Sequence, residues 1–84
     1  MTTSIYTPEM VALTTWLKAA RLERGLSMRA LGEALEKPHT YIQKVESGER
    51  RLDVVEFVWY CRALGVEPTA GLLALEKASG YSSY

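Results

Sequence analysis

Apolar residues recur along this 84-residue chain at intervals of three and four, which is the spacing of helices packed on a core. Short stretches that contain glycine, proline or a capping residue separate the periodic segments. The pattern predicts helices over about residues 8–24, 28–35, 39–47, 54–64 and 68–78, followed by a tail over 79–84. No segment alternates as a half-buried strand does. We therefore expect residues 1–84 to form one all-α domain of five short helices.

Residues at the segment ends support these boundaries. Thr7, Pro8 and Glu9 form a typical helix start, because they supply a side-chain cap, a first-turn proline and a favourable negative charge. Asp53 and Glu56 have the spacing of a capping box. Ser27 is expected to cap the second helix. Glycines end three of the segments, at Gly25, Gly48 and Gly65.

The helical period also predicts which side chains face the core. These are Met10, Leu13, Leu17, Ala20, Leu31, Ala34, Leu35, Tyr41, Ile42, Val45, Val54, Phe57, Val58, Cys61, Leu64, Leu72 and Leu75. Cys61 falls on this apolar stripe, so we interpret it as a small buried hydrophobe rather than a reactive thiol.

The third predicted helix, over 39–47, has two chemically different sides. Its inner side is apolar, and its outer side carries His39, Thr40, Gln43, Lys44 and Ser47. Solvated helix faces usually carry long charged residues, whereas this one carries mostly short or planar hydrogen-bonding groups. Ordinary solvent exposure is the simpler interpretation. The alternative is a surface that reads another molecule.

The connection before this helix favours the second interpretation. A capped helix, a bend over residues 36–38 and a polar-faced helix are the sequence form of a helix-turn-helix. In that motif the second helix enters the major groove of DNA. Gln43 could bond an adenine edge, and Thr40 could offer a hydroxyl or methyl group to a base.

The charge distribution is compatible with a DNA partner only locally. Ten basic and ten acidic residues give a formal net charge of zero, which argues against strong general attraction to nucleic acid. The segment 37–51 nevertheless carries +2, and 52–84 carries −2. Lys44, Arg50 and Arg51 flank the proposed reading side, where phosphates would lie. The alternative is that these are solvated loop charges.

Other function classes have little support. One cysteine and one histidine do not make an ordinary zinc site, and we expect no metal or other cofactor. A catalytic pair of Cys61 and His39 would need side chains from different helices and faces to meet, so we do not expect an enzyme. No apolar run reaches membrane-spanning length and no basic segment leads into an apolar run at the N-terminus. A cytoplasmic protein without a membrane partner is expected.

The segment from Leu17 to Pro68 closely resembles the lambda-repressor-like helix-turn-helix family, also called the XRE family of bacterial and phage regulators. The resemblance rests on "RGLS", "YIQKVESGERR" and "RALGVEP" taken together. It implies a five-helix domain in which the second and third helices form the motif. It also implies binding of operator DNA, usually by a symmetric dimer.

The resemblance implies roles for individual residues. His39, Thr40 and Gln43 would read bases, and Arg21 and Glu46 would form a structural ion pair. The backbone contacts would be Arg29, Lys37, Lys44, Ser47, Arg50 and Arg51. The sequence also departs from the family pattern. Met28 stands where members often carry a phosphate-binding glutamine, Pro38 replaces the usual cap, and His39 replaces a glutamine.

Trp59 is the second unusual feature. On the fourth predicted helix it projects opposite the core stripe, with Val55 and Ala63 beside it, and Leu73 of the fifth helix could extend the same patch. Relatives commonly place a charged residue there, and tryptophan is a frequent interface anchor. We hypothesise a homodimer interface. The alternative is that Trp59 packs against the terminal segments, through Ile5 and Tyr6 or Tyr81 and Tyr84.

The leading hypothesis is a sequence-specific DNA-binding transcriptional regulator, most plausibly a dimeric repressor of a pseudo-palindromic operator. A second hypothesis is an antitoxin or accessory subunit that mainly binds a protein partner through Val55, Trp59 and Leu73 and regulates itself by binding DNA.

Overall fold

Five helices joined by short turns make up residues 7–79, the part of the chain that this computed structural model describes. They are α1 (Pro8–Glu23), α2 (Met28–Leu35), α3 (His39–Ser47), α4 (Val54–Leu64) and α5 (Pro68–Ser79), and no strand occurs within 7–79. The predicted all-α fold and helix order are confirmed. Asp53 and Glu56 form the predicted capping box, with Asp53 Oδ1 accepting from Glu56 N at 2.7 Å and Glu56 Oε1 from Asp53 N at 2.9 Å.

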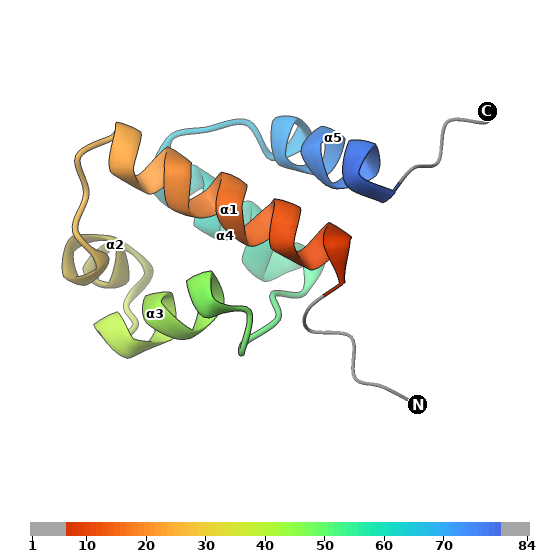
Figure 1. Cartoon of the computed structure of the whole chain (residues 1–84). Helices are drawn as coiled ribbons and strands as arrows, with labels where there is room; N and C mark the ends of the chain where they lie inside the picture. Colours follow the sequence, from red (N-terminus) through yellow and green to blue (C-terminus); the bar gives the residue numbers. More distant parts are fainter. Residues whose placement is uncertain (1–6, 80–84) are drawn as a thin grey trace.

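The helices form two groups around α1 and α4, as Figure 1 shows. The α5 helix packs along α1 on one side, while α2 and α3 pack together on the other. The α2 helix also contacts α4, and α3 contacts α1. The pair that the sequence predicts as a helix-turn-helix therefore stands on a base formed by α1 and α4.

The buried core comes from the first four helices and follows most of the predicted stripes. Its members are Leu17, Ala20, Leu31, Ile42, Val45, Phe57, Tyr60, Cys61 and Leu64. The prediction missed Tyr60, which is completely buried. It was wrong for Val54 and Leu72, which are 79% and 52% exposed, and for Ala34, which is also exposed. The inward side of α4 runs through residues 57, 60, 61 and 64, so the true stripe is rotated away from Val54.

Gly71 allows α5 to lie close to α1 and α4. A Cβ atom at this position would come within 2.8 Å of Trp16 Cζ3 and 2.9 Å of Phe57 Cζ. Real Cβ atoms essentially never approach other atoms so closely. The two aromatic rings therefore occupy the space that any larger residue at this point of α5 would need.

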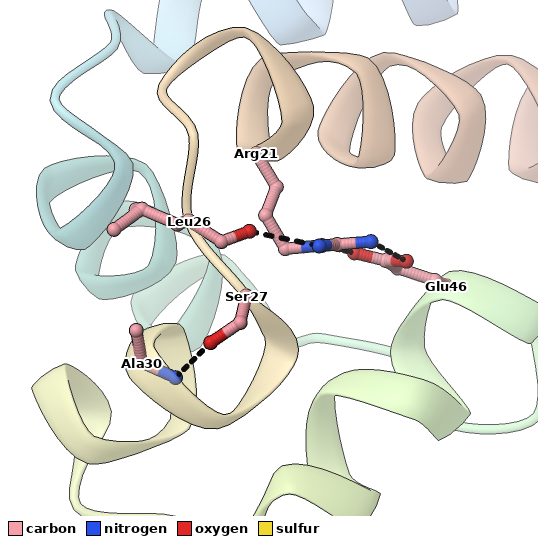
Figure 2. A network of polar contacts seen from close by, with 5 residues as sticks. All are labelled: Arg21, Leu26, Ser27, Ala30 and Glu46. Carbon is pink, nitrogen blue, oxygen red and sulfur yellow. Dashed lines mark hydrogen bonds and ion pairs between the residues drawn. The ribbon is translucent and has the colours of Figure 1, made fainter.

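A buried ion pair connects α1 to α3 (Figure 2). Arg21 Nε donates to Glu46 Oε2 at 2.6 Å, and Arg21 Nη2 donates to Glu46 Oε1 at 3.1 Å. Arg21 Nη1 donates to the carbonyl of Leu26 at 2.8 Å, just before the Ser27 cap of α2. The hydrogen bond to Glu46 raises the pKa of Arg21. The structure thus contains the pair that the family resemblance implies, and this pair also anchors the α1–α2 connection.

The turn between α2 and α3 depends on close backbone packing. A Cβ atom on Gly32 would lie 2.7 Å from the carbonyl oxygen of Lys37 and 3.3 Å from that of Pro38. Glu36 has φ 59° and ψ 42°, and it is the only non-glycine residue with positive φ among residues 7–79. Together these features bring the start of α3 directly against the side of α2.

We expect Glu46→Gln to lower the free energy of unfolding by about 3 kcal/mol, because it leaves the buried Arg21 guanidinium without a compensating charge. Urea denaturation followed by circular dichroism measures the change. Glu49→Gln, an exposed change on the same segment, is the control and should have little effect. Equal effects of the two substitutions would contradict the structural role of the pair.

Gly32→Ala should destabilise the protein by about 1–2 kcal/mol, because the added methyl group meets main-chain atoms that have little freedom to move. Helix propensity alone predicts the opposite sign, a gain of about 1 kcal/mol. Urea denaturation distinguishes the two. Ala34→Gly on the exposed side of α2 reports the propensity term alone.

Burial raises the pKa of the Cys61 thiol to about 11, so it stays protonated at pH 8. We expect iodoacetamide at pH 8 to react with the folded protein at least roughly 100-fold more slowly than with an unfolded chain. Mass spectrometry before and after denaturation in urea measures the difference. Comparable rates in the two states would show that the thiol is accessible.

Candidate nucleic-acid interface

The α3 helix is held by one side and open on the other. Ile42 and Val45 are buried in the core, while Tyr41 is half-buried at the edge. All three predicted base-reading residues are exposed, at His39, Thr40 and Gln43. Their amide, hydroxyl and imidazole groups therefore face away from the protein. This arrangement suits hydrogen bonding to base edges in a major groove.

The start of α3 has no side-chain cap. Pro38 occupies the capping position with extended backbone, and its side chain accepts no hydrogen bond. Only its carbonyl takes part, by accepting from Tyr41 N at 3.0 Å. Because a helix start with uncapped amides attracts anions, this end of α3 is compatible with a nearby phosphate.

The residues predicted to contact the DNA backbone differ in the interactions that their side chains make within the protein. Lys44 is exposed on α3, beside Gln43, and Arg29 is exposed on α2. Lys37 is exposed at the α2–α3 turn, with its Nζ 5.3 Å from the centroid of the Tyr41 ring. Arg51 is exposed after α3. All four residues are exposed, and they lie on α2, at the α2–α3 turn, on α3 and after α3.

Arg50 already interacts with two neighbouring side chains. Its Nη2 lies 2.6 Å from Glu56 Oε2, and its guanidinium carbon lies 5.4 Å from the centroid of the Tyr41 ring. Since Glu56 balances part of its charge, Arg50 has less to offer a phosphate than the sequence suggests. Burial, followed by the charge of Glu56, raises the pKa of Tyr41, so its phenol remains neutral beside these groups.

Ser47 is also engaged within the protein. Its hydroxyl lies 3.1 Å from the Lys44 carbonyl and 3.2 Å from Glu49 Oε2, and it can donate to either acceptor. A phosphate contact through this hydroxyl as donor would require that internal bond to break.

The sequence analysis missed the cation–π contacts that the Tyr41 ring makes with Lys37 and Arg50. The signal was a tyrosine between two basic positions, Lys37 and Arg50.

The predicted patch around Trp59 consists of exposed residues on two helices, α4 and α5. Trp59, Val55 and Leu73 are 59%, 55% and 53% exposed. Trp59 lines a groove of about 390 Å³ between α2 and α4, together with charged Glu36 and Arg62. Leu73 lies on α5 and is not among the residues that line this groove.

The terminal residues that could cover Trp59 lie outside the described part of the chain. They are Ile5, Tyr6, Tyr81 and Tyr84. A protein partner at Trp59 and Val55 stays a prediction.

Residues 7–79 contain neither a metal-binding cluster nor a helix that could span a membrane. Within 7–79, no group of three or more histidine, cysteine, aspartate or glutamate side chains is arranged to hold a metal ion. None of the helices in that range is both long and apolar enough to cross a membrane.

Comparisons with known proteins agree with the geometry. A family model described as Helix-turn-helix matches residues 17–70. Among solved structures, an XRE-family like protein from Pseudomonas syringae pv. tomato str. DC3000 is similar, with a TM-score of 0.76 and 39% sequence identity. That similarity covers 82% of this chain and 84% of the other. No curated protein matches the sequence. The open outer side of α3, its place after α2 and these similarities together establish that the chain belongs to the XRE-type helix-turn-helix family of DNA-binding proteins.

Proposed function

We propose that this DNA-binding protein is a sequence-specific transcriptional repressor that binds a pseudo-palindromic operator as a homodimer. The observation that carries the proposal is the outer side of α3, where His39, Thr40 and Gln43 are exposed while Ile42 and Val45 are buried. A helix clamped in this way can enter a major groove without losing its contacts to the core. A dimer spanning two half-sites would cover a promoter and exclude polymerase.

Within this proposal, base edges and phosphates are contacted by different residues. His39, Thr40 and Gln43 supply the base-reading groups, with Gln43 suited to a two-bond contact with adenine. Arg29, Lys37, Lys44 and Arg51 supply phosphate contacts. Arg50, which lies over the Tyr41 ring and pairs with Glu56, has a secondary part in these phosphate contacts.

The low net charge shapes how such a protein would bind. With a formal net charge of zero, general attraction to DNA is weak, so affinity depends strongly on the matched site. We expect a modest salt dependence, set by the few phosphates that the exposed cations reach. Non-specific binding should therefore be poor even at low ionic strength.

The operator can be found by selecting bound fragments from a random DNA pool at a stated salt concentration. Recovery of a sequence with two inverted half-sites, with centres about 34–36 Å apart or a multiple of that distance, would support a dimeric repressor. Recovery of no preferred sequence would contradict sequence-specific binding.

Paired substitutions on α3 test the assignment of roles. Gln43→Ala should weaken operator binding by about 1–3 kcal/mol and relax specificity at one base pair in each half-site. Lys44→Ala should weaken operator and random DNA by similar factors and flatten the salt slope by about one unit per half-site. Both residues are exposed, so neither change should alter stability much. If both variants lose affinity equally on all sequences, Gln43 does not read a base.

A further inference from the structure

A largely apolar groove lies between α4 and α5, on a different side from Trp59. It has a volume of about 270 Å³. Its walls include Leu13, Val54, Phe57, Val58, Leu72 and Leu75. Of all the residues that line it, Asp53 alone is charged, and its carboxylate already caps α4. We call this feature the Val54 groove.

Two apolar side chains at the Val54 groove are strongly exposed. Val54 is 79% exposed and Leu72 is 52% exposed, although the helical period of the sequence predicts that both face the core. Single exposed apolar residues are common, but contiguous ones beside an apolar hollow mark an interaction surface. The groove beside Trp59 differs, because Glu36 and Arg62 line it and favour water.

We propose that a second copy of this chain occupies the Val54 groove, so that this surface, rather than the one around Trp59, forms the dimer. This inference rests on the proposed function. A patch that contains both protruding side chains and a hollow can bind its own copy, since Val54 of each protomer can enter the groove of the other. The scarcity of charge in the groove means that two identical surfaces meet with little repulsion.

The position of the groove suits a protein that reads two half-sites. Val54 begins α4 and follows Arg51 by three residues, so the groove starts close to the predicted DNA-contacting loop. In Figure 1 the start of α4 lies to the right of α3, and α5 lies above them. A two-fold axis that runs vertically in that view, to the right of the start of α4, would therefore leave both α3 helices on the same lower side.

The molecule measures 39 × 29 × 21 Å along its principal axes, which is of the same order as the spacing of half-sites. Recognition helices on adjacent major-groove faces need a separation of about 34–36 Å. A standard stable interface buries roughly 1,600 Å² and involves about 20–30 residues on each side, whereas nine residues line the Val54 groove. We therefore expect a weak dimer in solution that forms readily when both copies are bound to one operator.

The decisive measurement is the ratio of affinities for the full operator and an isolated half-site. Wild-type protein should prefer the full site by at least about tenfold beyond statistical effects. The double substitution Val54→Gln with Leu72→Gln should reduce that ratio at least about tenfold while leaving half-site affinity unchanged. The matched control is Trp59→Gln, which changes an equally exposed apolar residue outside the groove and should preserve the ratio. None of these substitutions alters the net charge.

Several outcomes would overturn the proposal. The first is an unchanged preference for the full operator in the double variant, and the second is loss of that preference in Trp59→Gln. The third is a preference that persists when about half a helical turn of DNA, about 5 base pairs, is inserted between the half-sites. Deleting residues 2–6 should also preserve the ratio. Gain of self-association only after that deletion would show that the N-terminal segment occupies the groove instead.

Sedimentation equilibrium separates failure of this inference from failure of the proposed function. Without DNA, wild-type protein at about 1 mM should show reversible dimers, in the weak range of protein association, and the double variant should not. If wild-type protein binds no DNA but dimerises in this way, the repressor role fails and the dimer surface stands. If it binds DNA but stays monomeric at this concentration, or if the double variant dimerises equally, the dimer surface fails.

Discussion

The buried contact between Arg21 and Glu46 controls where α3 points. The two residues are 25 positions apart in the chain, yet their charged groups meet at 2.6 Å, with Arg21 only 6% exposed. Neither charge is tolerable in the interior without the other. The same guanidinium also binds the Leu26 carbonyl, so α1, the start of the α2 region and α3 share one point of attachment. The orientation of the exposed side of α3, with His39, Thr40 and Gln43, is therefore set by a contact to which none of these three residues contributes.

Apart from this ion pair, close packing and charge both affect how α2 and α3 are arranged. Gly32 lets the backbone of the turn approach α2, and Ile42 and Val45 hold the inner side of α3. The outer side is left free to make hydrogen bonds. Charge has a smaller part, because Glu56 partly balances Arg50 and the chain as a whole is neutral. The proposed reading of DNA by α3 would therefore rely mainly on complementary shape and hydrogen bonding, with electrostatic attraction in a supporting role.

Local rules were enough to predict most of the fold. Capping residues such as Asp53 and the three-and-four periodicity located all five helices, because both depend only on neighbouring residues. The exposure of Gln43 followed from the same periodicity. The inward direction of Tyr60 and the outward direction of Val54 depend on how α4 is rotated against its neighbours, which a sequence pattern fixes only to within about one residue. The engagement of Arg50 depends on Glu56 across a loop, and the need for glycine at position 32 depends on a turn five residues later. These are tertiary contacts.

Gly71 has a consequence for how such a regulator can change over time. The rings of Trp16 and Phe57 fill the space where its side chain would be, so even one methyl group would require either these rings or α5 to shift. The helix-turn-helix lies on the opposite side of α1 and α4 and makes little use of α5. In the proposed dimer, a single-nucleotide change at this codon would thus alter the α5 side of the Val54 groove while leaving His39, Thr40 and Gln43 unchanged. Divergence between related regulators in half-site spacing could begin at such a position, with no change in the bases that each half-site contains.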